Sequence, residues 1–262
     1  MKILHITDLH IGWEERIENE KQIWDRLFRE ISETVNENKI DMLAVTGDLV
    51  MHGTKEEYQR VEMYLHHLRK ILALNKNQVF FCCGNHDSDT PNAGSSFSEY
   101  EAFLKRFYEN KEMEKQSFNW QKTGRLCCDI PVFSISSCKK TSLKYFNDCW
   151  LDSEDVDEIL KEAEPGKKGI LLMHHQPELF DEQTEIKRLN QAVKVILGGH
   201  LHSGYTRQYI WKGMTVINGL AVSPHFHFLP RGFQIVEIGD NNQIETWMYV
   251  DKGEGNVDKE RA

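Results

Sequence analysis

The first third of the chain alternates between short apolar runs and longer amphipathic segments. Residues 2–7, 42–46 and 79–83 are mostly apolar runs, and their β-branched and aromatic content predicts buried strands. Residues 23–35 and 54–72 repeat apolar side chains every three or four positions, which places those side chains on one face of a helix. This order of strand, helix, strand, helix and strand predicts parallel pairing with right-handed crossovers.

Turn-forming and capping residues mark the ends of these segments. Thr54 and Glu57 form an expected capping box at the start of the second helix. Residues 88–126 are expected to be an insertion or loop region over the site, with a helix capped by Ser98 together with Glu101 and a polar excursion over 109–124.

The second half of the chain is richer in strand signals. A helix is expected to begin at Asp152 or Ser153 and to end before Pro165. Buried strands are expected over 169–173 and 193–197, and several short strands without a helix over 205–250. We therefore expect one domain over residues 1–250, and a frayed tail over 251–262, which is charged and poor in apolar residues.

Composition narrows the class of protein. The 262 residues are 40% hydrophobic and 28% charged, which is enough apolar content for a core. No apolar run reaches the roughly 18 residues of a membrane helix, and the N-terminus lacks the features of a signal peptide. The six cysteines have no CxxC spacing, so we expect reduced thiols in a cytoplasmic protein with no membrane partner. A net charge of −9 disfavours broad nucleic-acid binding and leaves a small anionic substrate open.

Five short blocks of metal-binding residue types follow the apolar runs. They are Asp8-Leu9-His10, Gly47-Asp48, Gly84-Asn85-His86-Asp87, His174-His175 and Gly199-His200-Leu201-His202. Ligands of open α/β sheets bind beyond the carboxyl ends of the strands, where Asp8, Asp48 and Asn85 fall. One such block would be a weak signal, but five in order predict a site with enough carboxylate, amide and imidazole groups for two divalent ions. Mn²⁺, Fe, Zn²⁺ and Co²⁺ all suit these ligands.

The order of these blocks resembles the calcineurin-like metallophosphoesterase superfamily, whose pattern is D-x-H, G-D, G-N-H-D/E, H and G-H-x-H. The resemblance runs from Asp8 to His202 and implies an α/β fold, a four-layer α-β-β-α sandwich of two mixed β-sheets flanked by helices. It also implies that one ion is held by Asp8, His10 and His202, the other by Asn85, His174 and His200, and that Asp48 bridges them.

A two-metal site of this kind implies hydrolysis of a phosphate ester by in-line attack of a metal-bridging hydroxide. A bridging carboxylate holds two ions about 3.5–4 Å apart, the spacing that clamps a phosphoryl group. Two divalent ions, two aspartates and one hydroxide sum to a net charge of +1, which attracts the ester, and the neutral amide of Asn85 preserves that charge. His86 is expected to bind a phosphoryl oxygen or protonate the leaving group, and Asp87 to orient its ring.

Several other histidines have open roles. The family places the ligand first in such segments, which selects His174 and leaves His175 as a substrate-side group or a packed residue. His225 and His227 are candidates for substrate contacts, for a third metal site or for plain surface. His5 is expected to be a hydrogen-bonded core residue.

Within the superfamily, the blocks look most like those of the phosphodiesterases of cyclic nucleotides and glycerophosphodiesters. A small phosphodiester is therefore the expected substrate, with a nuclease or a phosphomonoesterase as the enzymatic alternatives. An inactive binding module with the same fold is the alternative from another class. The chain departs from the family at Gln176, where many relatives have proline, and it lacks the G-D-x-V-D-R-G motif of protein phosphatases.

Overall fold

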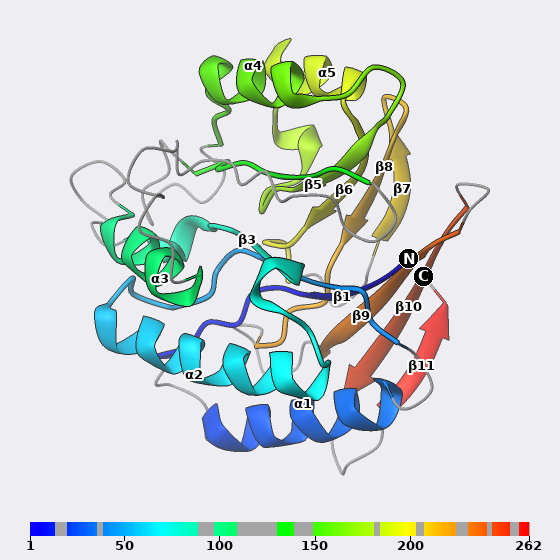
Figure 1. Cartoon of the computed structure of the whole chain (residues 1–262). Helices are drawn as coiled ribbons and strands as arrows, with labels where there is room; N and C mark the ends of the chain where they lie inside the picture. The colour runs from blue at the N-terminus through cyan, green and yellow to red at the C-terminus, as the bar shows by residue number, and fades with distance from the viewer. Residues whose placement is uncertain are drawn as a thin grey trace.

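Two β-sheets that pack face to face, with helices on their outer faces, form the computed structural model of the chain (Figure 1). The structure describes residues 1–13, 20–35, 39–88, 97–108, 130–138, 149–180, 184–202, 207–223, 230–239, 243–251 and 257–261. The expected excursion over 109–124 lies outside these residues.

The first sheet has six strands in the order β11-β10-β9-β1-β2-β3. Its parallel strands are β1 (Lys2–Ile6), β2 (Met42–Thr46) and β3 (Val79–Cys82), and its antiparallel strands are β9 (Arg231–Ile238), β10 (Ile244–Asp251) and β11 (Val257–Arg261). The expected parallel pairing of the first three strands is confirmed.

The second sheet has five strands in the order β4-β5-β6-β8-β7. Parallel strands are β4 (Val132–Ser134), β5 (Gly169–Leu172), β6 (Val193–Gly198) and β8 (Met214–Asn218), and β7 (Arg207–Trp211) pairs with β8 in the antiparallel sense. Both sheets are therefore mixed, and the predicted four-layer sandwich is confirmed.

Helices cover the outer face of each sheet. The first sheet carries α1 (Glu20–Val35), α2 (Lys55–Ile71) and α3 (Ser98–Tyr108), and the second carries α4 (Ser153–Glu162) and α5 (Thr184–Arg188). Short 3₁₀ helices are η1 (Lys76–Gln78), η2 (Asn85–Asp87), η4 (Pro177–Phe180) and η5 (Leu189–Gln191). None of the helices within the described ranges combines the length and apolar content needed to cross a membrane.

The predicted helix starts are largely confirmed. Thr54 caps α2, and the reciprocal bonds with Glu57 complete the capping box. The carboxylate of Asp152 accepts from the backbone N–H of Glu154 and so caps α4. The predicted cap at Ser98 is corrected: Ser98 is the first residue of α3, and the backbone N–H of Glu101 donates to the Phe97 carbonyl at 2.8 Å.

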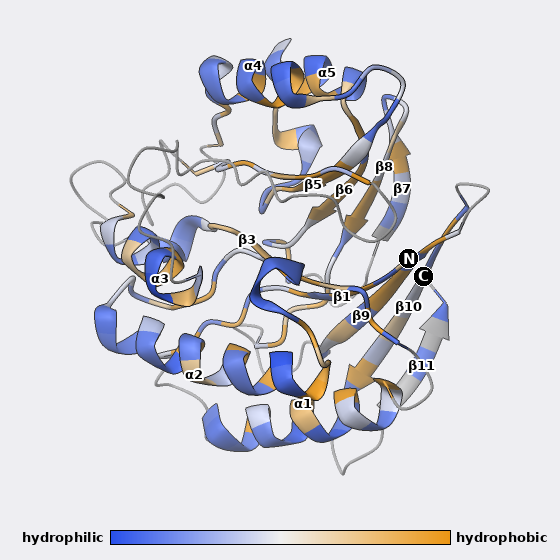
Figure 2. Cartoon of the chain, viewed as in Figure 1, coloured by the Kyte–Doolittle hydropathy of each residue, from blue (hydrophilic) through white to orange (hydrophobic). Residues whose placement is uncertain are grey.

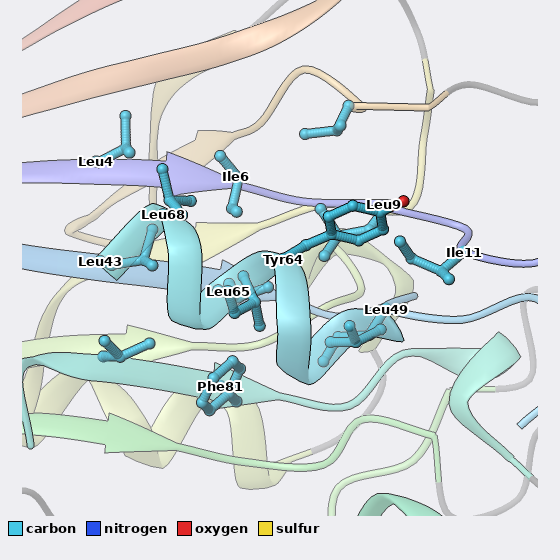
Figure 3. Close-up of a cluster of buried hydrophobic side chains, with 14 of the residues drawn as sticks. Leu4, Ile6, Leu9, Ile11, Leu43, Leu49, Tyr64, Leu65, Leu68 and Phe81 are labelled. Carbon is cyan, nitrogen blue, oxygen red and sulfur yellow. The ribbon is translucent and has the colours of Figure 1, made fainter. Parts of the chain in front are cut away.

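Alternating residues of the central strands build two cores. Leu4 and Ile6 of β1 face the helices, whereas Ile3 faces the second sheet. Figure 3 shows Leu65 and Leu68 of α2 packed over these strands. The outward-facing parts of the helices are largely hydrophilic, and hydrophobic residues concentrate between the helices and the sheets (Figure 2). Both faces of each central strand of the first sheet are therefore buried.

Truncating the centre of this helix–sheet core should destabilise the fold. Leu65 is fully buried, so Leu65→Ala is expected to lower the free energy of unfolding by about 2–5 kcal/mol, through lost burial and a residual cavity. Met63 on the same helix is 57% exposed, and Met63→Ala should change that free energy by less than about 0.5 kcal/mol. Urea unfolding measures both, and equal effects would contradict the assigned orientation of α2.

The last residues of the chain do not fray as expected. Residues 257–261 form β11, which pairs with β10 along five registered residue pairs. The ammonium of Lys259 lies 4.7 Å from the centroid of the Trp247 ring, and the guanidinium of Arg261 bonds to Glu245 at 2.7 Å. The low apolar content misled the prediction, because an edge strand can be held by backbone hydrogen bonds and cation–aromatic contacts instead.

Candidate metal centre

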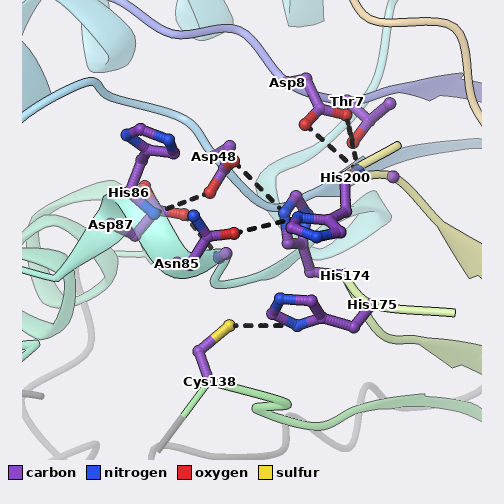
Figure 4. Close-up of polar contacts among 12 residues, drawn as sticks. Thr7, Asp8, Asp48, Asn85, His86, Asp87, Cys138, His174, His175 and His200 are labelled. Carbon is purple, nitrogen blue, oxygen red and sulfur yellow. Dashed lines mark hydrogen bonds and ion pairs between the residues drawn. The ribbon is translucent and has the colours of Figure 1, made fainter. Parts of the chain in front are cut away.

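Strand ends from both sheets meet at one edge of the sandwich (Figure 4). The turn after β1 runs beside the turn after β2, because the backbone N–H groups of Asp8 and His10 donate to the carbonyls of Gly47 and Asp48 at 3.1 and 3.0 Å. The second sheet joins this edge where Nδ1 of His174 bonds to the Thr46 carbonyl at 2.8 Å. The topology therefore brings together residues that are far apart along the chain.

Five of the seven candidate ligands share an unusual backbone conformation. Asp8, His10, Asp48, His200 and His202 all have positive φ angles, between 42° and 74°. Only two other non-glycine residues of the described chain, Ala73 and Lys212, have positive φ. Such angles cost free energy for residues with a Cβ and concentrate at functional sites. Here they turn each side chain away from the line of its strand.

The first group of donor atoms comprises Asp8, His10, Asp48 and His202, whose ligand atoms all lie within 4.8 Å of one another. Nε2 of His202 lies 2.9 Å from Oδ1 of Asp8 and also 2.9 Å from Nε2 of His10. Nε2 of His10 is 3.8 Å from both Asp8 and Asp48. These buried nitrogen and oxygen atoms converge on one point, as the ligands of a cation do.

The second group comprises Asp48, His174 and His200, again within 4.8 Å. Nε2 of His174 lies 3.3 Å from Oδ2 of Asp48, and the bond from its Nδ1 to Thr46 fixes the orientation of the ring. Asn85 joins this group, because its Oδ1 lies 3.1 Å from Nδ1 of His200. Asp48 belongs to both groups.

Hydrogen bonds orient the two aspartates. Oδ1 of Asp48 accepts from the backbone N–H of His86 at 2.8 Å, while Oδ2 lies toward His10 and His174. Oδ2 of Asp8 accepts from the Thr7 hydroxyl at 2.8 Å and from the His200 backbone N–H at 3.1 Å, and its Oδ1 lies toward His202. Each carboxylate thus keeps one oxygen directed at the imidazoles.

Electrostatics favours charged aspartates in this centre. Burial raises the pKa of Asp48, but the imidazoles of His174, His86 and His10 outweigh burial and hold it well below its usual value. Burial lowers the pKa of His174, yet Asp48 and Asp8 raise it to about 10. Burial and the neighbouring His174 lower the pKa of His200 to about 4. Metal binding would therefore displace a proton from His174, whereas His200 is already neutral.

The donor set fits divalent transition metals. Buried imidazole nitrogens and carboxylate oxygens converge in both groups, and Nδ2 of Asn85 has no hydrogen-bond partner among the described residues, which agrees with an amide that is held through its oxygen. Mixed imidazole, carboxylate and amide ligation suits Mn²⁺, Fe, Zn²⁺ and Co²⁺. The two groups of donor atoms overlap at one carboxylate, that of Asp48.

Two glycines of the sequence blocks pack directly against the aspartates. A Cβ at Gly84 would lie 2.2 Å from Oδ1 of Asp48, and a Cβ at Gly199 would lie 2.0 Å from the Thr7 hydroxyl and 2.7 Å from Oδ2 of Asp8. Both distances are far inside van der Waals contact. The glycines in the G-N-H-D and G-H-x-H blocks are therefore required for the aspartates to sit where they do.

We expect Gly84→Ala to disturb the centre through Asp48. Overpacking costs about 1–3 kcal/mol, and relief of the 2.2 Å contact would displace the carboxylate and lower metal content. Gly166→Ala is the control, because its Cβ would meet nothing within 4 Å while its φ of +80° still costs about 1–2 kcal/mol. Elemental analysis and thermal unfolding together separate the two effects. Normal metal content in Gly84→Ala would contradict the steric argument.

The catalytic candidates His86 and Asp87 differ in their surroundings. His86 is buried at the centre, its ring lies edge-on to that of His10 at 4.9 Å between centroids, and Nδ1 lies 3.2 Å from the Met51 carbonyl. The carboxylate of Asp87 accepts instead from the backbone N–H groups of Leu49 and Gly84, at 3.0 and 2.7 Å, and from the Tyr58 hydroxyl. The expected orientation of His86 by Asp87 is therefore corrected: Asp87 ties the loops after β2 and β3 together, and the Met51 carbonyl contacts the ring.

The remaining histidine candidates differ in their burial and in their contacts. His175 is fully buried, Nδ1 lies 2.8 Å from the Ser137 hydroxyl, and its ring packs 4.3 Å from that of His200. Burial and these contacts agree with the packed alternative, and the substrate-side role stays a prediction. His225 and His227 lie outside the described residues. His5 is a buried core residue bonded to Thr46 and Gln234, as expected, and burial lowers its pKa to about 3.

Sequence reasoning missed the residues that support the ligands. Thr7 follows the last residue of β1, and Thr46 is the last residue of β2. Both contact the centre through side-chain or backbone oxygen atoms. Tyr58 of α2 supports Asp87 from the helix layer. The threonines lie next to the motif blocks, and this proximity could have predicted their role. The position of Tyr58 on a helix face gave no such indication.

Comparisons with known proteins agree with this site. The chain is 24% identical over 204 residues to an uncharacterized metallophosphoesterase of Helicobacter pylori, covering 78% of this chain but only 45% of the relative. The chain thus spans about half the length of that relative. It is also 25% identical over 227 residues to a 3′,5′-cyclic-nucleotide phosphodiesterase of Nostoc sp., covering 79% of this chain and 74% of that protein.

A similar fold occurs in a dimetal phosphatase from Danio rerio, with a TM-score of 0.61, 11% identity and coverage of 100% of this chain and 98% of the other. The calcineurin-like phosphoesterase family model matches residues 1–204, a span that contains every candidate ligand. The ordered motif blocks, the sandwich of two mixed sheets and this match lead to one conclusion. The chain belongs to the calcineurin-like phosphoesterase family.

Proposed function

We propose that this protein is a metal-dependent phosphoesterase that holds two divalent ions at the edge of the sandwich. The observation that carries the proposal is the sharing of Asp48 by two groups of buried donor atoms. Membership of the phosphoesterase family supports the reaction class. Asp8, His10 and His202 would hold one ion, Asn85, His174 and His200 would hold the other, and Asp48 would contribute to both.

Divalent ions bound there would supply positive charge and lower the pKa of bound water toward about 7. The chain's own groups orient the reaction. The backbone N–H of His86 holds one oxygen of Asp48, and the Met51 carbonyl contacts Nδ1 of the His86 ring. We assign Nε2 of His86 to a phosphoryl oxygen or the leaving alkoxide, which it could protonate.

A small phosphodiester is the substrate that we favour, of the cyclic-nucleotide or glycerophosphodiester kind. The relative in Nostoc sp. bears the name of a cyclic-nucleotide phosphodiesterase, and 74% of its length is covered. The net charge of −9 disfavours an extended polyanion such as duplex DNA, so a nuclease is the weaker alternative.

Two chromogenic esters test this proposal. We expect hydrolysis of the diester bis-p-nitrophenyl phosphate in the presence of Mn²⁺, faster than hydrolysis of the monoester p-nitrophenyl phosphate, and loss of both on chelation. Faster monoester hydrolysis would identify a phosphomonoesterase. Hydrolysis of neither ester by the metal-loaded protein would contradict enzymatic function and favour a binding module.

A further inference from the structure

One peptide group of the metal centre is held on both sides. The carbonyl of Gly199 accepts a hydrogen bond from the side-chain amide of Gln176. The N–H of the same peptide, which belongs to His200, donates to the carboxylate of Asp8 at 3.1 and 3.2 Å. The peptide therefore lies between the Gln176 amide and the Asp8 carboxylate, and its orientation depends on both.

The Gln176 side chain is well placed for this contact. It is only 4% exposed, and it follows His174 and His175 in the turn after β5. The backbone N–H of Gly199 donates to the His174 carbonyl at 2.9 Å, so the turns after β5 and β6 are tied together by two bonds. Because a carbonyl only accepts, the nitrogen of the Gln176 amide must face Gly199. The bond thus has a defined direction.

This peptide carries or contacts residues of both donor groups. Its N–H orients Asp8 of the first group, and it is bonded covalently to His200 of the second. His200 has a φ of 74°, an angle that costs free energy and needs external support. Hydrogen bonds in series polarise one another, so donation to the Gly199 carbonyl strengthens the N–H that reaches Asp8.

We propose that Gln176 is a positioning residue that holds Asp8 and His200 in register, and so links the two metal positions. The proposal rests on the proposed two-metal function. The contact requires a side-chain donor at position 176, which the Gln176 amide supplies. Gln176 touches neither group directly and acts through the Gly199–His200 peptide.

Metal affinity tests this role without reference to turnover. Gln176→Met keeps the length of the side chain and removes the donor, and we expect it to weaken Mn²⁺ binding about 10–100-fold, as loss of a ligand-orienting partner does. Gln78→Met is the matched control, because the Gln78 amide donates to the Asp41 carbonyl at 3.0 Å, away from the centre. Titration calorimetry with Mn²⁺ and electron paramagnetic resonance of the loaded protein are the two readouts.

The resonance spectrum separates positioning from a general loss of stability. We expect the signal of a coupled Mn²⁺ pair in the wild type and in Gln78→Met, and its weakening in Gln176→Met. Gln176→Glu, which also lacks the donor, should reproduce this result if the methionine variant folds poorly. Wild-type affinity in both Gln176 variants would overturn the proposal alone. Failure of the wild type to bind Mn²⁺ would overturn the proposed function as well.

Discussion

Asp48→Asn is expected to lower metal content at both positions and to reduce turnover by about 10³-fold. The substitution keeps the shape of the side chain and removes the charge that both donor groups share. Metal ions contribute several kcal/mol of transition-state stabilisation, and each 1.4 kcal/mol corresponds to a factor of ten. Elemental analysis and hydrolysis of the diester measure the two quantities on the same preparation.

The shared position of Asp48 makes this result distinctive. Substitution of a residue that binds one ion would leave about half of the bound metal. Substitution of a residue that both ions share should lower the metal content at both positions. Asp25→Asn is the control, since Asp25 is an exposed residue of α1 whose partner is Lys21. Full metal content with wild-type turnover in Asp48→Asn would remove Asp48 from the centre.

His86→Ala is expected to retain its metal and to lose about 10²–10⁴-fold in turnover. The His86 backbone N–H, which holds Asp48, survives the substitution, whereas the imidazole does not. The His86 ring packs edge-on against the ring of His10, and this contact places it beside the first group of donor atoms. We expect the substitution mainly to lower kcat, because the imidazole transfers its proton to the leaving group only in the transition state.

The control for this variant is His67→Ala on the exposed face of α2. Equal metal content in His86→Ala and the wild type, measured by elemental analysis, would separate catalysis from ligation. Reduced metal content would reassign His86 as a ligand or as a support of one. Normal turnover with normal metal content would exclude His86 from the mechanism.

Much of the fold follows from local patterns. The apolar runs that end at Asp8, Asp48 and Asn85 predict parallel strands with a shared edge, and the structure has that arrangement. Thr54 and Glu57 likewise predict the start of α2 because their bonds are local. These predictions succeed since each depends on residues a few positions apart.

Long-range contacts explain what local patterns missed. Asp87 follows His86 directly, yet its carboxylate reaches Leu49, which the pairing of β2 with β3 brings near, and Tyr58 of α2. The His175 ring is bonded by Ser137 from the turn after β4 and packs against the His200 ring, contacts that its place beside His174 in the sequence does not reveal. Adjacency in the sequence does not determine which of two neighbouring side chains faces solvent, the core or the centre.

The positive φ angles of the ligand residues have a consequence for protein engineering. Each such angle redirects the Cα–Cβ bond, so five of the seven proposed ligands reach the centre through a bend of the main chain. Glycine would relieve the bend but would remove the donor group. Grafting the same side chains onto straight strand ends of another α/β scaffold would therefore not recreate the centre, and a transplant must carry the turns with it.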